Sequence, residues 1–80
     1  MIPDIHPEDV FPVRLKAAMA AADISAADLA ERSGTNRNGI RIYLCGRGVP
    51  SAFILARMAA TLQVSCDWLL GLVENKEDIG

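Results

Sequence analysis

The stretch Ser25–Leu44, SAADLAERSGTNRNGIRIYL, decides the fold. Ser25 is a favoured N-cap, and Asp28 three residues later completes a capping arrangement, so a short helix is predicted to begin here. Gly34 predicts the end of that helix, because glycine adopts the left-handed conformation without steric cost. Asn36 is a second N-cap. The stretch therefore predicts two short helices joined by a tight turn.

The second of these helices separates an apolar face from a polar one. The residues expected to pack are Ile40, Tyr43 and Leu44, which repeat at the i, i+3, i+4 interval of a buried stripe. The residues expected to face outward are Arg37, Asn38, Arg41 and Ile42. A helix, a short turn with Gly, and a second helix displaying Arg and Asn is the layout of a helix-turn-helix.

The outward residue types match those that read bases in the DNA major groove. Arg can bond guanine O6 and N7 as a fork, and Asn can bond adenine N6 and N7. A recognition helix enters the groove by its N-terminal end, where Arg37 and Asn38 stand. Many helix pairs of this kind only pack within small bundles. On this stretch alone, the two interpretations are equally supported.

The wider chain favours DNA binding. A characteristic set of positions runs through Val13–Gly71: Leu15, Ile24, Ser25, Leu29, Ala30, Gly34, Ile40, Tyr43, Gly46, Arg47, Pro50, Ser51, Leu55, Met58, Ala59, Leu62, Val64, Ser65, Asp67, Leu69, Leu70 and Gly71. In the spacing of this set the chain resembles the lambda-repressor/Cro-like family of helix-turn-helix regulators. The resemblance implies an all-α five-helix bundle and a homodimeric, sequence-specific regulator, which we expect to be a repressor of the phage or prophage type that binds a two-fold operator.

The chain also departs from the family pattern. Ala26 stands where many members carry a Gln that touches the DNA backbone, so that contact is absent. Leu44 and Cys45 replace the polar pair usual at the end of the recognition helix, which argues against base contacts near Leu44. Gly39 lowers helix propensity by roughly 1 kcal/mol relative to Ala. A glycine at this position either allows the DNA backbone to approach the helix closely or is merely tolerated there.

The loop that follows the second helix has one Arg between two glycines, GRGVP at residues 46–50. Such a loop suits a phosphate, and a plain connector is the alternative. A helix N-terminus also attracts phosphate. We expect base contacts from Arg37, Asn38, Arg41 and Ile42, the last against a thymine methyl, and phosphate contacts from Asn36 and Arg47.

Charge is distributed unevenly along the chain. The formal net charge is −2, but residues 13–64 carry seven basic and three acidic side chains, a net of +4. The two ends contribute −3 each. Salt screens charges beyond roughly 10 Å, so phosphate binding depends on the local field. We expect a modest, salt-sensitive affinity for double-stranded DNA that depends on dimerisation.

The 80 residues allow one domain around one core, and a hydrophobic share of 51% that is rich in Ala favours an all-α fold. Pro3, Pro7 and Pro12 cannot share a continuous helix, so residues 1–12 are predicted to form an N-terminal arm. The first helix is expected to begin at Val13. Residues 13–73 form the helix-turn-helix domain, and residues 74–80 a charged, flexible tail.

Apolar side chains near the C-terminus predict self-association. Trp68, Leu72 and Val73, with Phe53, offer more apolar surface than a small domain needs to bury, and Trp is favoured at interface centres. Burial of Trp68 within its own domain is the equally weighted alternative. The alternative function is a protein-binding module, such as an antitoxin or corepressor, that holds another protein through Trp68 and the N-terminal arm.

The sequence gives no indication of an enzyme, a bound cofactor or a metal site. His6 is the only His and has no nucleophile to serve. Cys45 and Cys66 have no neighbouring CxxC or His, so neither zinc nor a redox pair is indicated, and redox sensing by Cys45 is a minor alternative. No apolar stretch is long enough to span a membrane, and the acidic N-terminus is unlike a secretory signal. A cytoplasmic protein without cofactors is expected.

Overall fold

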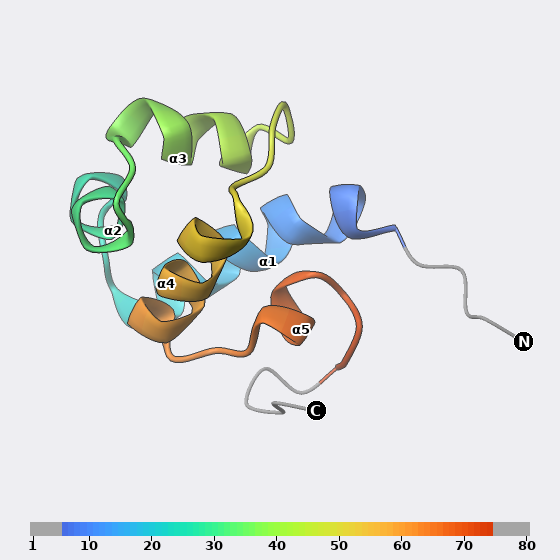
Figure 1. Cartoon of the computed structure of the whole chain (residues 1–80). Helices are drawn as coiled ribbons and strands as arrows, with labels where there is room; N and C mark the ends of the chain where they lie inside the picture. The colour runs from blue at the N-terminus through green and yellow to red at the C-terminus, as the bar shows by residue number, and fades with distance from the viewer. Residues whose placement is uncertain (1–5, 75–80) are drawn as a thin grey trace, which may run out of the picture.

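The computed structural model describes residues 6–74, which form five α-helices and no strand (Figure 1). Their bounds are α1 Pro7–Ala22, α2 Ala26–Ser33, α3 Arg37–Leu44, α4 Ala52–Leu62 and α5 Cys66–Leu69. The predicted all-α five-helix architecture is therefore confirmed. Residues 1–5 and 75–80, which include most of the predicted tail, lie outside the described part. No described helix has both the length and the apolar character needed to cross a lipid bilayer.

α1 begins at Pro7 and not at Val13, so the predicted N-terminal arm is wrong from Pro7 onward. Pro7 occupies the first helical turn, where its missing N–H needs no partner. Pro12 lies inside the helix, and an interior proline costs about 3 kcal/mol. Its neighbour Phe11 is only 3% exposed, and burying a Phe contributes about 1.5–3 kcal/mol. Tertiary packing of Phe11 thus offsets most of the penalty that predicted a break.

Each of the other four helices begins with a side-chain N-cap, and the caps at Ser25 and Asn36 are the two predicted above. Such a cap contributes about 1 kcal/mol, because it satisfies a backbone N–H that has no partner within the helix. Gly34, with φ of 81°, ends α2 in the left-handed conformation. The four capping bonds run from Asp28 N to Ser25 Oγ (3.1 Å), Gly39 N to Asn36 Oδ1 (2.8 Å), Ile54 N to Ser51 Oγ (3.2 Å) and Trp68 N to Ser65 Oγ (3.0 Å).

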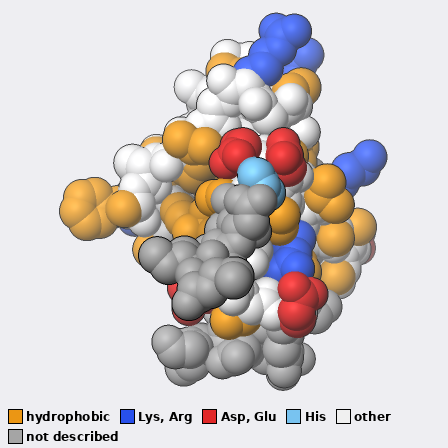
Figure 2. Space-filling view, turned by 90° about the vertical axis from the view of Figure 1, so that its right-hand side faces the viewer, with side chains coloured by type: hydrophobic (Ala, Val, Ile, Leu, Met, Phe, Trp, Pro, Cys, Tyr) orange, Lys and Arg blue, Asp and Glu red, His pale blue; other side chains and the backbone are white. Residues whose placement is uncertain are grey.

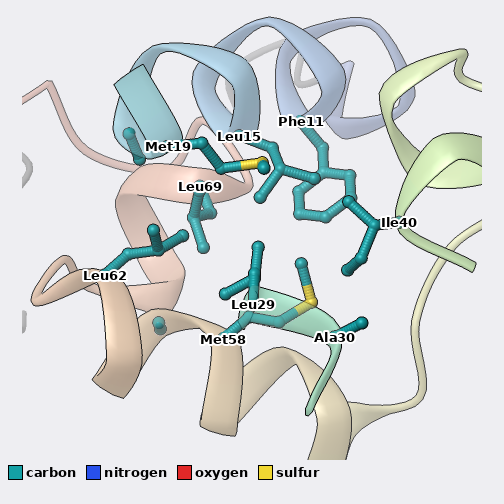
Figure 3. Close-up of a cluster of buried hydrophobic side chains, with 11 residues drawn as sticks. Phe11, Leu15, Met19, Leu29, Ala30, Ile40, Met58, Leu62 and Leu69 are labelled. Atoms are coloured by element: carbon teal, nitrogen blue, oxygen red, sulfur yellow. The ribbon is translucent and has the colours of Figure 1, made fainter. Parts of the chain in front are cut away.

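One apolar core receives side chains from all five helices (Figure 3). α3 contributes a single fully buried side chain, Ile40, and packs against α2 and α1 through it. Tyr43 and Leu44 are half-buried against the same core. α3 is therefore fixed along one side only, and its other side is left on the surface. The buried apolar residues are Phe11, Leu15, Ala18, Met19, Leu29, Ala30, Ile40, Met58, Ala59, Leu62 and Leu69.

Candidate nucleic-acid interface

α3 lies along one outer edge of the bundle, at the top of Figure 1, and turns its polar side to solvent. Arg37, Asn38, Arg41 and Ile42 are all exposed, Ile42 by 37%. The helical repeat places Asn38 and Ile42 opposite Ile40, and it places Arg37 and Arg41 at the margins of that exposed face. The structure thus places the predicted base-reading side chains on a free helical surface. Their contact with DNA remains a prediction.

Four exposed residues of α3 and its C-cap form one stripe at the i, i+3, i+4, i+7 spacing: Asn38, Arg41, Ile42 and Cys45. Together with Arg47 they line a shallow hollow of about 150 Å³. We call the four residues Asn38, Arg41, Ile42 and Cys45 the α3 stripe. Arg37 is exposed one turn ahead of Arg41 but does not line the hollow. The structure therefore brings Asn38, Arg41, Ile42 and Arg47 together and leaves Arg37 at the edge.

The loop after α3 folds back against the helix. The N–H of Arg47 donates to the carbonyl oxygen of Ile42 at 3.1 Å. A Cβ on Gly48 would lie 2.9 Å from Cγ2 of Ile42, closer than real Cβ contacts come. Glycine at position 48 therefore permits the close approach that sets Arg47 beside the helix. The spacing of the sequence gives no signal for this contact.

Gly39 in the first turn of α3 has a structural role. A Cβ at this position would lie 2.6 Å from Oγ1 of Thr35, so a larger residue would displace Thr35. The N–H of Gly39 also donates to the cap at Asn36. Packing against Thr35 is therefore one reason for glycine here, and close approach to the DNA backbone stays a prediction. Because the Asn36 side chain is used in capping, a phosphate contact here would come from first-turn backbone N–H groups.

The charged side chains of residues 32–66 are all positive, and Glu8 of α1 is an acidic residue that lines a hollow with Arg47. From residue 32 to residue 66 the sequence has no Asp or Glu. Lys and Arg side chains project from the upper end of the molecule in Figure 2, the end at which α3 lies in Figure 1, and acidic side chains beside the single His lie below them. This local excess outweighs the net charge of the chain within a Debye length of roughly 10 Å. The five cations, all exposed, are Arg32, Arg37, Arg41, Arg47 and Arg57.

Arg57 was missed by the sequence analysis. It stands on α4, and its Nη1 lies 3.3 Å from the position of a Cβ on Gly34. Arg57 therefore reaches over the turn that joins α2 to α3. The absence of acidic residues from 32 to 66 is the signal that would have drawn attention to it. Cys45 was also left out of the predicted contacts, although the i+7 spacing from Asn38 places it on the α3 stripe.

The residues predicted for a dimer interface lie on the C-terminal segment. Leu72 is 51% exposed, and Trp68 and Val73 are half-buried. The guanidinium of Arg14 lies 5.0 Å from the ring centroid of Trp68, so one face of the indole is covered within the domain. Phe53, on α4, is 78% exposed. The interface itself remains a prediction.

His6 lies near two acidic groups at the start of α1. Its Nδ1 is 3.6 Å from Oε1 of Glu8, and one ligand atom from each of His6, Glu8 and Asp9 lies within 4.8 Å of the others. All three side chains are exposed. This group lies at the N-terminal end of α1 and includes no residue of the α3 stripe.

Comparison with known protein families gives a match over most of the chain. A helix-turn-helix family model covers residues 15–69, from α1 to the end of α5, and includes the pair α2 and α3. No match was found among curated proteins. The resemblance drawn from the sequence is therefore confirmed. The chain belongs to the lambda-repressor/Cro-like helix-turn-helix family of DNA-binding transcriptional regulators.

Proposed function

We propose that the protein is a sequence-specific repressor of the phage or prophage type that binds a two-fold operator as a homodimer. The observation that carries this proposal is the α3 stripe: Asn38, Arg41 and Ile42 share one exposed helical face with Arg47 beside them. Residues 32–66, which include this stripe, contain no acidic side chain that would repel a phosphate backbone. Family membership supports DNA binding in general, and the stripe supports the reading of bases.

Each side chain of this surface has a role that its chemistry favours. Arg37 and Asn38 occupy the first turn of α3, which enters the major groove first, and contact base edges. Arg41 contacts a base or a phosphate, and Ile42 meets a thymine methyl. Arg47 holds a phosphate, because the loop keeps it next to the helix. The first-turn N–H groups that follow Asn36 hold another phosphate.

The homodimer sets the spacing of the two recognition helices. Two copies related by a two-fold axis contact half-sites roughly 34 Å apart, or a multiple of that distance. We place the interface on Trp68, Leu72 and Val73, of which Leu72 is the most exposed. An apolar patch at this position suits a second copy, since homodimer interfaces are more apolar than the rest of a protein surface.

Selection of bound duplexes from a random pool tests the proposal. We expect enrichment of one sequence with two inverted half-sites, bound with an affinity that falls steeply as salt rises. A pool that yields no motif would overturn sequence-specific recognition. The protein-binding alternative predicts that outcome, together with no salt-dependent retention of DNA.

A further inference from the structure

Arg14 on α1 is enclosed by the C-terminal segment of the chain. Its Nη1 donates to the carbonyl oxygens of Trp68 and Val73, each at 2.7 Å. Its guanidinium stacks 5.0 Å from the centroid of the Trp68 ring, and Nη2 lies 3.4 Å from Oε2 of Glu74. The Arg14 side chain is only 19% exposed, whereas that of Glu74 is 94% exposed. The carbonyl and ring contacts, rather than the solvated ion pair, define this arrangement, which we call the Arg14 clasp.

The Arg14 clasp stabilises the chain reversal after α5, which local interactions stabilise only weakly. α5 has four residues and contributes one buried side chain, Leu69, so it has little stability of its own. After it the chain reverses through Gly71, whose φ is 86°, and the N–H of Leu72 donates to the carbonyl of Asp67 at 2.8 Å. The carbonyls that Arg14 binds stand on either side of this reversal. One guanidinium therefore fixes the segment at both ends.

We propose that Arg14 is the positioning residue of the dimer surface: by binding the carbonyls of Trp68 and Val73, it sets the segment that presents Leu72 to a second copy of the chain. The inference depends on the homodimer proposed above. Arg14 belongs to neither the α3 stripe nor the dimer contact, so its effect on DNA binding passes through dimerisation. The alternative explanation is that Arg14 supplies only one more positive charge to the DNA-binding domain.

The test compares three variants by sedimentation equilibrium of the full chain. Arg14→Met keeps a long stem but loses both hydrogen bonds and the charge. We expect a dimer dissociation constant about tenfold higher, which is about 1.4 kcal/mol, because the segment that carries Leu72 is no longer fixed. Arg14→Lys keeps the charge and N–H donors but cannot stack as a plane, so its constant should lie between those of wild type and Arg14→Met. Lys16→Met removes a charge from an exposed neighbouring position and should leave the dimer unchanged.

Fluorescence gives a second readout, because Trp68 is the only Trp. Loss of the clasp should shift its emission in Arg14→Met while the helical circular dichroism is retained. Should Arg14→Met lose that dichroism, Arg14→Lys decides: a weakened dimer supports the clasp and a wild-type dimer overturns it. If Lys16→Met weakens the dimer equally, or if a folded Arg14→Met forms a wild-type dimer, the proposed role of Arg14 is overturned. The homodimer itself is not contradicted by either result. A wild-type chain that stays monomeric overturns the homodimer and with it this inference.

Discussion

The backbone N–H of Arg47 donates a 3.1 Å hydrogen bond to the carbonyl oxygen of Ile42. This bond turns the loop after α3 back along the outer side of the helix. Arg47 thereby lines the same shallow hollow as Ile42, Asn38 and Arg41. Helix and loop form one continuous basic surface, and the predictions below follow from how that surface and its supports are built.

Gly48 allows the loop after α3 to pack closely against that helix. Its missing Cβ would stand 2.9 Å from Cγ2 of Ile42, so Gly48→Ala pushes the loop away from α3. Overpacking by a methyl group costs about 1–3 kcal/mol, and an exposed loop relieves it by moving. We expect duplex affinity to fall about three- to tenfold with little change in Tm. Val49→Ala, at a 74% exposed neighbouring position, is the control and should bind normally. Wild-type affinity of Gly48→Ala would contradict the positioning of Arg47 by this contact.

Substitutions of Arg37 and of Arg47 are expected to affect DNA binding in different ways. Arg37→Ala should reduce binding to the selected duplex by about 1–3 kcal/mol and relax the preference at one base pair. Arg47→Ala should weaken cognate and random duplexes alike and lower the salt slope by about 1, as the loss of a phosphate contact does. Titrations of both variants against both duplexes at several salt concentrations measure the difference. The assigned roles fail if the two variants lose equally on cognate and random DNA.

Ser33 in α2 carries a stability prediction. Its side chain is fully buried, and Oγ has no hydrogen-bond partner among the described residues. A buried unsatisfied hydroxyl costs about 1–3 kcal/mol, so Ser33→Ala should raise the free energy of unfolding by about 1 kcal/mol. Ser25→Ala offers a matched change of opposite sign, because the Ser25 cap accepts from Asp28 N at 3.1 Å and its loss costs about 1 kcal/mol. Denaturant unfolding checks both, and a destabilised Ser33→Ala would show that Oγ has a partner.

The reactivity of the Cys45 thiol is expected to show whether DNA covers the α3 stripe. Its thiol is exposed on the same hollow as Asn38 and Arg41, whereas Cys66 is half-buried with Sγ 3.9 Å from the carbonyl oxygen of Leu55. We expect the selected duplex to slow maleimide labelling of Cys45 by about tenfold or more, since the stripe then faces the groove. Labelling of Cys66 serves as the internal control and should not respond. Unchanged labelling of Cys45 in the complex would place the DNA on another face.

The features that could be predicted from sequence are local ones. The N-caps at Ser25, Asn36, Ser51 and Ser65 act within three residues, so their side chains specify where helices begin. Ile40 is buried, and the polar positions of α3 are exposed, because a helical repeat fixes which residues share a face. The two helices of the motif and their exposed surface followed from these signals, whereas the five-helix bundle followed from the resemblance to the family.

The features that escaped prediction depend on contacts between distant segments. α1 extends back to Pro7 because Phe11 packs in a core built from other helices, which overrides the local effect of Pro12. The approach of Gly48 to Ile42 is likewise set by the folded backbone and has no periodic signature. The Arg14 clasp joins α1 to residues at the far end of the chain. Spacing along a helix carries no information about such pairs.

The central claim is that side chains on the outer face of α3 read bases. Repeating the duplex selection with Asn38→Ala tests it most directly, because this variant removes one amide from the α3 stripe and leaves the charge unchanged. We predict that the enriched motif loses its preference for adenine at one position in each half-site and keeps the others. An unchanged motif, bound with uniformly lower affinity, would contradict base reading by this face.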